Sequence, residues 1–224
     1  MENDFMQTMV LTFELATITT IVLLFIGIPI ASFLVFTKTK FKSVIETIVS
    51  MPLVLPPSVL GFYLLLAFSP ASFMGEFLTS HGIRLAFSFE GLIIGSVLFS
   101  LPFMVHPIQS ALSQVPASIF EAAYTLGKSK LTTMLRVVLP TIRHGLISGI
   151  VLAFAHTVGE FGVILMIGGN IPGETRVASI AIYDEVESLN YAMAHQYALT
   201  LFVVTFSILL VVYTLNKKSL ETMR

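Results

Sequence analysis

The stretch that decides how this chain is organised reads EAAYTLGKSKLTTMLRVVLP, from Glu121 to Pro140. It carries three lysines or arginines and a glutamate, in a chain of which 55% is apolar and only 11% is charged. Soluble domains average roughly 25% charged residues. Together with a mean hydropathy of +0.91, this composition predicts an integral membrane protein in which the quoted stretch is an unusually polar interruption.

Long apolar runs surround that stretch, each with at least the roughly 20 residues that a helix needs to cross the hydrocarbon layer. We place the spans at about 10–36, 44–68, 91–112, 141–167 and 192–215, with a polar loop at 113–140. The prediction is an all-α integral membrane protein, a polytopic bundle of about five transmembrane helices in a single domain over residues 1–224. The first run has no basic segment before it, so we expect a retained span rather than a cleaved signal.

The basic residues orient these spans, because ten of the twelve fall on one side of the predicted membrane. They are Lys38, Lys40 and Lys42, then Lys128, Lys130, Arg136 and Arg143, then Lys217, Lys218 and Arg224. Only Arg84 and Arg176 fall on the other side. Positive loops stay in the cytoplasm, which predicts an outer N-terminus, a cytoplasmic C-terminus and a cytoplasmic position for residues 121–140.

The cytoplasmic loop contains a predicted short helix. Ser118 and Glu121 have the spacing of a capping box at a helix start, and Gly127 is expected to end or bend the helix. Small and aromatic side chains lie between these signals, at Phe120, Ala122, Ala123 and Tyr124. The residues alone leave two interpretations open: a surface that a partner protein contacts, or an interfacial helix that merely connects two spans.

The same loop resembles the cytoplasmic signature of bacterial ABC importer permeases. That pattern is Glu-Ala-Ala, three residues, Gly, then nine residues before a hydrophobic-x-Leu-Pro ending. The matching positions here are Glu121, Ala122, Ala123, Gly127, Val137, Leu139 and Pro140, with Val137 where Ile is commoner. The resemblance implies a coupling helix that docks on an ATP-binding cassette ATPase subunit. ATP and magnesium would then be bound by that partner, and this chain would hold no cofactor.

Two further stretches resemble the molybdate, tungstate and sulfate group of these permeases. They are PLVLPPSVLG at residues 52–61 and GEFGVILMIGGNIPGETR at residues 159–176, the latter followed by AIY at residues 181–183. The resemblance implies a subunit of the bacterial inner membrane that imports molybdate or tungstate. It also implies three kinds of protein partner: a second permease copy, two ATPase subunits and a periplasmic molybdate-binding protein. Sulfate or thiosulfate is the alternative substrate.

Three prolines interrupt the second predicted span, at Pro52, Pro56 and Pro57. They lie about 8 to 13 residues from its cytoplasmic end, and about 1.5 Å of rise per residue places them near the bilayer midplane. Irregular backbone at that depth is tolerated only where protein buries it or where it lines a cavity. The prolines therefore indicate either a pathway lining or a packing kink.

An ionisable residue, Glu160, lies inside the fourth predicted span. A carboxylate repels an oxyanion, so we expect it to break the helix or make a structural hydrogen bond near the pathway, with a gate as the alternative. The outer end of the same span carries Gly168, Gly169 and Asn170. Their amides suit a mobile turn or a transient oxyanion contact, and a plain loop is equally compatible.

The sequence carries no complete enzymatic motif. His156 and Glu160 have i, i+4 spacing, but no third metal ligand is apparent and the His-Glu-x-x-His pattern is absent. The nucleophile motif Gly-x-Ser-x-Gly and the phosphate-binding Gly-x-x-x-x-Gly-Lys-Ser/Thr motif are absent too. We predict a permease that is not itself an ATPase, with lipid around it and no nucleic acid as a partner. An ion-coupled secondary transporter is a further alternative, for which Glu160 is the strongest coupling candidate.

The predicted orientation is tested with single cysteines, because the natural chain has none. Cysteines at Thr39, Ser129 and Ser219 are expected to be shielded from an impermeant thiol reagent in intact cells, whereas one at Ser80 is expected to react. The measurement is labelling before and after the cells are opened. Labelling of position 129 from outside would contradict the predicted orientation and show that residues 121–140 do not face the cytoplasm.

Overall fold

The computed structural model describes residues 2–221, with side chains for residues 3–214. All regular elements of residues 2–221 are helical. In a hydrocarbon layer the backbone groups of a spanning segment must bond within the segment, which a helix achieves alone. The predicted all-α class is confirmed.

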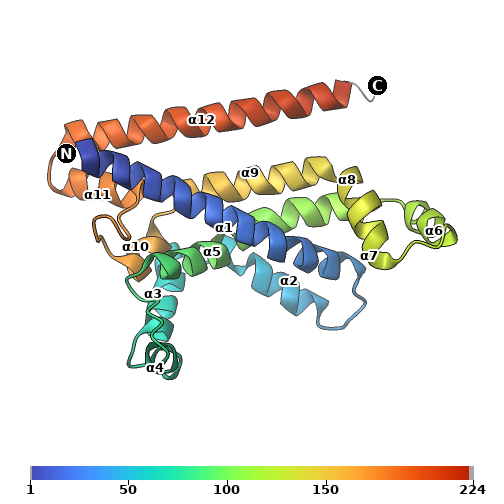
Figure 1. The fold of residues 1–224 in the computed structure, drawn as a ribbon, viewed down its shortest axis with the longest axis horizontal. Coiled ribbons are helices and arrows are strands. Elements are labelled where there is room, and N and C mark those ends of the chain that lie inside the picture. The colour runs from blue at the N-terminus through green and yellow to red at the C-terminus, as the bar shows by residue number, and fades with distance from the viewer. Residues whose placement is uncertain (1, 222–224) are drawn as a thin grey trace.

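A bundle of three helices forms the centre of the molecule. These are α1 (Glu2–Phe36), α5 (Phe89–Ser113) and α9 (Arg143–Gly159), which contact one another in every pairing. Figure 1 shows α1 running obliquely along the bundle, with α5 and α9 beside it. Leu23, Met104 and Ala153, one from each helix, are fully buried in the shared core.

The helix α12 (Tyr191–Glu221) is the outermost element and runs along one edge of the molecule (Figure 1). It contacts α11 (Ala178–Glu187) and α9. Only 6% of its span-like part is buried in the chain, so most of its apolar surface is free for lipid or another subunit. Arg224 lies outside the described residues, as do the side chains of Lys217 and Lys218.

Three helices are long and apolar enough to cross a membrane by themselves, and the described residues contain up to five spans if each bent helix pair counts as one. The first bent pair is the second predicted span. It divides into α2 (Lys42–Ser50), a 3₁₀ turn (Met51–Leu53) and α3 (Pro57–Phe68), and the direction changes by 107°. Proline removes a backbone donor and cannot continue a helix from the preceding turn, which accounts for the sharp break at the prolines.

The fourth predicted span, at 141–167, is not one helix. The helix α9 ends at Gly159 and α10 (Gly162–Gly168) begins two residues beyond Glu160. Glu160 itself is extended, with φ −67° and ψ 135°. The second bent pair lies at the other end of α9, where residues 130–141 meet it at 77°.

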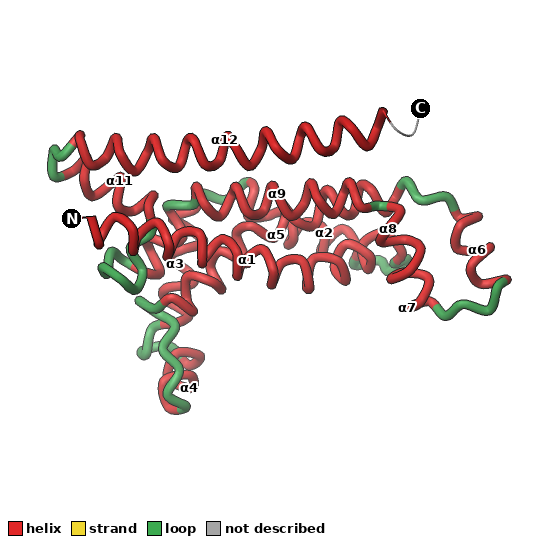
Figure 2. Tube along the Cα trace, turned by 45° about the horizontal axis from the view of Figure 1, so that its top comes forward, coloured by secondary structure: helices red, strands yellow, loops and turns green. Residues whose placement is uncertain are grey.

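Short helices cap both ends of the bundle. At the end near the N-terminus lie α10, α11 and the loop between them; α3 projects sideways and carries α4 (Phe73–Ser80) at its tip (Figure 1). At the opposite end lie α6 (Ala117–Thr125), α7 (Lys130–Thr133), a π-helical turn (Met134–Val138) and α8 (Leu139–Thr141). Figure 2 shows α6 set apart from the bundle, with a loop on each side. The predicted polar loop is therefore largely helical.

Close approach of α5 and α9 depends on two glycines spaced by four residues, Gly145 and Gly149. A Cβ atom on Gly149 would lie 3.0 Å from the carbonyl oxygen of Met104 and 3.2 Å from its sulfur. A Cβ atom on Gly145 would meet Ala111 and the carbonyl oxygen of Pro107. Small residues at this spacing are the usual means by which membrane helices pack backbone to backbone.

Replacing Gly149 with valine is expected to destabilise the protein by about 1–3 kcal/mol, because the added methyl groups overpack the α5 and α9 contact. The same replacement at Gly159 is the matched control, since no atom lies within 4 Å of a Cβ atom built there. Thermal unfolding of both variants in detergent checks the difference. Equal melting temperatures would contradict the packing role of Gly149.

Candidate functional site

The segment around α6 presents a mixed surface at the end of the bundle. Glu121 and Ala122 are exposed and Ala123 is buried. The two aromatic side chains, expected on one side, are used differently. Phe120 packs edge-on against Phe36 of α1 at 5.4 Å between ring centroids, whereas Tyr124 remains 45% exposed. One aromatic therefore anchors α6, while the other is free for a partner.

The predicted capping box at the start of this helix is wrong. The N-cap is Pro116, in extended conformation with φ −61° and ψ 141°, and no side chain caps the helix. Ser118 is consequently the second helical residue, and Glu121 lies too far along to close a box with it. Ala117 has high helix propensity, so the helix extends back past Ser118 as far as the proline.

The end of α6 is as the sequence predicts and is built by Gly127. This residue has φ +70°, in the left-handed region that favours glycine. Its N–H donates to the carbonyl oxygen of Tyr124 at 2.9 Å, and the N–H of Lys128 donates to that of Ala123 at 3.0 Å. This pair of bonds is a Schellman motif, which satisfies carbonyls at a helix end. Gly127 thus sets the direction in which the chain leaves α6.

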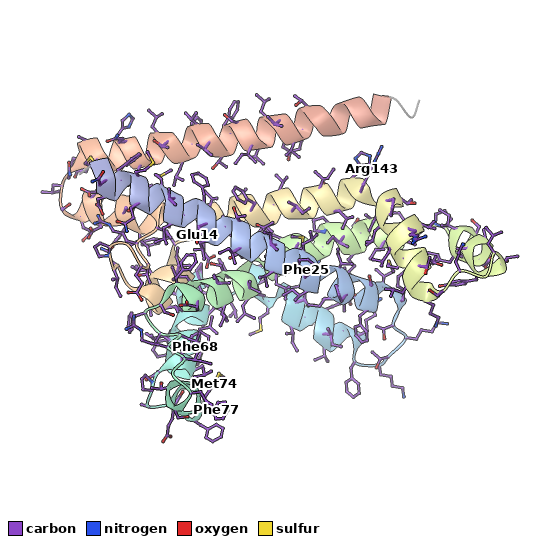
Figure 3. The ribbon with its side chains drawn as sticks, in the orientation of Figure 1. Glu14, Phe25, Phe68, Met74, Phe77 and Arg143 are labelled. Carbon is purple, nitrogen blue, oxygen red and sulfur yellow. The ribbon has the colours of Figure 1, made fainter. Side chains whose placement is uncertain are left out.

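A short loop at residues 126–129 leads from α6 into a helical connection, residues 130–141, that joins it to the bundle. The hydroxyl oxygen of Ser129 caps α7 by accepting from the N–H of Thr132 at 3.2 Å. The π-helical turn that follows ends just before Pro140 in α8, where Leu139 N–H reaches back to the carbonyl oxygen of Met134. Proline has no N–H, so the ordinary bond to the carbonyl of Arg136 is lost there. Figure 3 shows Arg143 at the next junction, where α9 begins.

The structure brings together the breaks in the second and fourth predicted spans. Pro57 is the first residue of α3 and Gly162 the first of α10. A Cβ atom on Gly162 would lie 2.7 Å from the Cβ atom of Pro57, so the two helix starts are in close contact. Pro52 lies in the 3₁₀ turn, and Pro56 is extended and exposed. No local pattern in the sequence indicates that these two breaks meet.

Glu160 lies at this junction, with only 3% of its surface exposed. Its carbonyl oxygen accepts a hydrogen bond from the Ser179 hydroxyl at 2.5 Å. Neither carboxylate oxygen has a hydrogen-bond partner among the described residues, and the buried hydroxyl of Ser96 on α5 is in the same condition. Glu160 therefore breaks the helix, as expected. Such a buried, unsatisfied group is costly and marks a functional candidate.

The turn after α10 is held by hydrogen bonds. Gly168 is buried, and the N–H of Gly169, where φ is +65°, donates to the carbonyl oxygen of Leu165 at 2.9 Å. Asn170 is exposed. Thr175, which the sequence analysis overlooked, is fully buried, and its hydroxyl accepts from the N–H of Ile171 and donates to the carbonyl oxygen of Gly168. The amides of residues 169 and 171 are thus already occupied, which leaves them unsuited to hold an oxyanion.

The sequence did not single out the ion pairs near this turn. Arg176 contacts Asp184 at 2.9 Å, Glu185 at 3.3 Å and Asp4 at 3.7 Å, so it joins the start of α1 to α11. Arg176 served in the sequence only to orient the spans, and its position there does not indicate these ion pairs. Another charged residue missed in the sequence, Glu14, is exposed on α1 (Figure 3). It precedes Phe36, the last residue of α1, by 22 residues, or about 33 Å of helix.

His156, considered as a metal ligand with Glu160, has a different environment. Its ring stacks on Phe103 at 3.9 Å between centroids, and its Nδ1 atom lies 2.9 Å from the Ser100 hydroxyl. Ser100 also lies 3.0 Å from the Thr157 hydroxyl. The histidine is thus part of a polar contact between α5 and α9.

Comparison with known proteins identifies the class to which this fold belongs. Residues 7–220 match the family of binding-protein-dependent transport system inner membrane components. The fold matches a crystal structure of a bacterial ABC transporter involved in the import of the acidic polysaccharide alginate, with a TM-score of 0.79. That match has 19% sequence identity and covers 96% of this chain and 79% of the other. The chain belongs to this family of binding-protein-dependent permeases.

Two relatives within the family differ in the solute that they are named for. The molybdenum transport system permease protein ModB of Azotobacter vinelandii is 45% identical over 205 residues, 91% of each chain. A probable sulfate transport system permease protein, cysT of Zygnema circumcarinatum, is 34% identical over 211 residues, covering 93% of this chain and 73% of that one.

Replacement of Gly127 tests whether the exit from α6 matters for coupling. Valine at a left-handed position costs about 1–2 kcal/mol or more, because its Cβ atom crowds the backbone, so Gly127→Val is expected to redirect the segment after α6. We expect the variant to stay in the membrane, with weaker ATPase-subunit association or ATP hydrolysis that no longer drives uptake. Co-purification, ATPase rate and uptake are the three measurements.

The matched control is Gly127→Asn, because asparagine tolerates the left-handed conformation and no atom lies within 4 Å of a Cβ atom at this position. The asparagine variant is expected to remain close to the natural protein in all three measurements. Natural values for the valine variant would show that the backbone direction at Gly127 is irrelevant to the partner.

Proposed function

We propose that this chain is the membrane-spanning permease subunit of an ATP-driven importer that carries molybdate or tungstate into the cytoplasm. The observation that carries the proposal is the 45% identity to the molybdenum permease of Azotobacter vinelandii over 91% of both chains. The family match over residues 7–220 includes every predicted span and the segment around α6, so the likeness extends to the parts that a transporter needs.

Docking of an ATPase subunit is assigned to α6. Its Glu121, Ala122 and Tyr124 are exposed at one end of the molecule, while Phe120 holds the helix to α1. A displacement of α6 is transmitted through the helical connection at residues 129–141 to α9, which packs tightly on α5. ATP and magnesium belong to the partner subunit in this proposal, and the permease converts its movement into alternating access.

A second copy of the chain is assigned as the other half of the pathway. The arm formed by α3 and α4 stands away from the bundle (Figure 1), and Figure 3 shows Met74 and Phe77 near its tip. Phe73, Met74 and Phe77 are 90%, 49% and 58% exposed. An arm with so little cover in one chain suits packing against another subunit, and five spans are few to enclose a gated pore.

The proposed orientation puts α6 in the cytoplasm and the turn at residues 168–177 outside. The described chain ends lie at opposite ends of the bundle (Figure 1), as an odd number of crossings requires. The outer end, tied together by Arg176, is where a periplasmic molybdate-binding protein would deliver its cargo. The family sets aside the alternative of an ion-coupled secondary transporter.

Sulfate import is the second candidate, favoured by the 34% identity to a permease named for sulfate. The deciding experiment uses the chain purified with its co-encoded ATPase and binding protein and reconstituted in vesicles. We expect ATP-dependent uptake of labelled molybdate that excess sulfate does not suppress. Uptake of sulfate in preference to molybdate would establish the second candidate, and uptake of neither would refute both.

A further inference from the structure

Two helices at the cytoplasmic end each carry a row of polar residues spaced i, i+3, i+4, i+7. We call these two rows together the inner polar lane: Ser43, Glu46, Thr47 and Ser50 on α2, with His106, Gln109, Ser110 and Ser113 on α5. That spacing places each set on one face of its helix. None of these residues belongs to the signature stretch at residues 121–140 or is one of the three interrupting prolines.

The surface of α2 divides into three faces. Val49 is 4% exposed, and Ile45 packs beside it on the bundle core. Val44 and Ile48 form an exposed apolar face, 55% and 61% accessible. The polar face lies between them and is separate from both, so α2 has one face for the bundle, one for lipid and one that suits neither.

The same division applies to the inner part of α5. Ile108 and Leu112 are buried in the bundle core, at 0% and 1% exposure. Ser110 and Ser113 are exposed, and His106 and Gln109 are half-buried. The polar row of α5 therefore faces away from the core, on the side where α2 lies.

Contacts between side chains join the two rows into one surface. The Ser50 hydroxyl lies 3.2 Å from Nε2 of His106, and Nε2 of Gln109 donates to Oε1 of Glu46 at 3.1 Å. Lys42 lies 3.8 Å from the same carboxylate. The one carboxylate of the lane is thus balanced by a cation and an amide, so the surface is polar without a strong net negative charge.

Three open hollows lie along the lane. One of about 580 Å³ is lined by Ser43, Glu46, Thr47 and Ser50 with Met51, Val54 and Leu55. A second, of about 440 Å³, lies against His106, Gln109, Ser110 and Ser113. A third, of about 490 Å³, shares Ser110 and continues across to His144 and Ser148 of α9. The first hollow extends along α2 as far as the bend at the prolines.

A polar face at this depth requires water or protein against it. Ser50 is eight residues from the start of α2, or about 12 Å along its axis, and hydrocarbon does not satisfy exposed hydroxyl and amide groups. Resting on the proposed function, we propose that the inner polar lane is the water-filled wall of the cytoplasmic half of the pathway, along which a hydrated tetrahedral oxyanion leaves the protein.

The chemistry of the lane fits release better than binding. Serine and threonine hydroxyls rotate and donate a hydrogen bond to any passing oxygen, and glutamine adds an amide donor. Such donors replace part of an anion's hydration without a fixed positive charge to retain it. Conduction requires sites that are favourable enough to enter and weak enough to leave.

The test uses neighbouring cysteines at one depth, introduced singly into the cysteine-free chain and assembled with the ATPase and binding protein. Thr47→Cys lies on the polar face, and Ile48→Cys lies on the apolar face of the same turn. In inside-out vesicles, the anionic reagent 2-sulfonatoethyl methanethiosulfonate is expected to label position 47 at least about tenfold faster, because it reacts with a hydrated thiolate. Ser110→Cys, on the polar face of α5, is also expected to be labelled quickly by this reagent.

Uptake after labelling separates a pathway wall from any other wet surface. Labelled Thr47→Cys and Ser110→Cys complexes are expected to import molybdate several-fold more slowly than the same complexes before labelling. Equal labelling rates at positions 47 and 48 would overturn the proposal, as would unchanged uptake after complete labelling. Failure of the natural complex to import either oxyanion would refute the proposed function independently, and the labelling contrast would still decide whether the lane is water-filled.

Discussion

Backbone hydrogen bonding inside a hydrocarbon layer is the constraint on which this structure depends. A helix satisfies its own backbone, so every break in a span must be shielded by protein or by water. The chain breaks two spans, near Pro56 and at Glu160, and it places the resulting helix starts in contact at Pro57 and Gly162. Each break thereby covers part of the other, with Glu160 buried at the junction while Pro56 and Pro57 remain exposed.

Tight packing of α5 against α9 gives that junction a rigid support. Gly145 and Gly149 let the two backbones approach, and α9 continues through a bend of 77° into the helical connection from α6. A force applied at α6 would reach α9 through the short loop at residues 126–129 and then through the helical residues 130–141. Since α5 also carries half of the inner polar lane, movement at the partner surface and the width of the proposed exit are mechanically linked.

Much of this arrangement was predictable because it depends on local or one-dimensional signals. The number of apolar runs predicts the helical membrane class, and Gly127 predicts the end of α6 because few other residues adopt its backbone conformation. The prediction of a capping box at Ser118 and Glu121 was wrong because Ala117 is also helical, so the helix begins directly after Pro116. The prediction of the fourth span as one helix was wrong because a hydropathy average does not detect a break of only two residues, Glu160 and Phe161.

The sequence by itself determined the membrane class, the polar segment around α6 and its family signature, since composition, charge and spacing are properties of the chain alone. Only the tertiary structure decided that Pro57 meets Gly162, that Arg176 joins α1 to α11, and that Ser50 and Glu46 of α2 lie against His106 and Gln109 of α5. Residues as far apart as Ser50 and His106, 56 positions, carry no mutual signal in one sequence. Their meeting depends on which helix faces pack, and packing is settled by the fit of whole surfaces across the bundle.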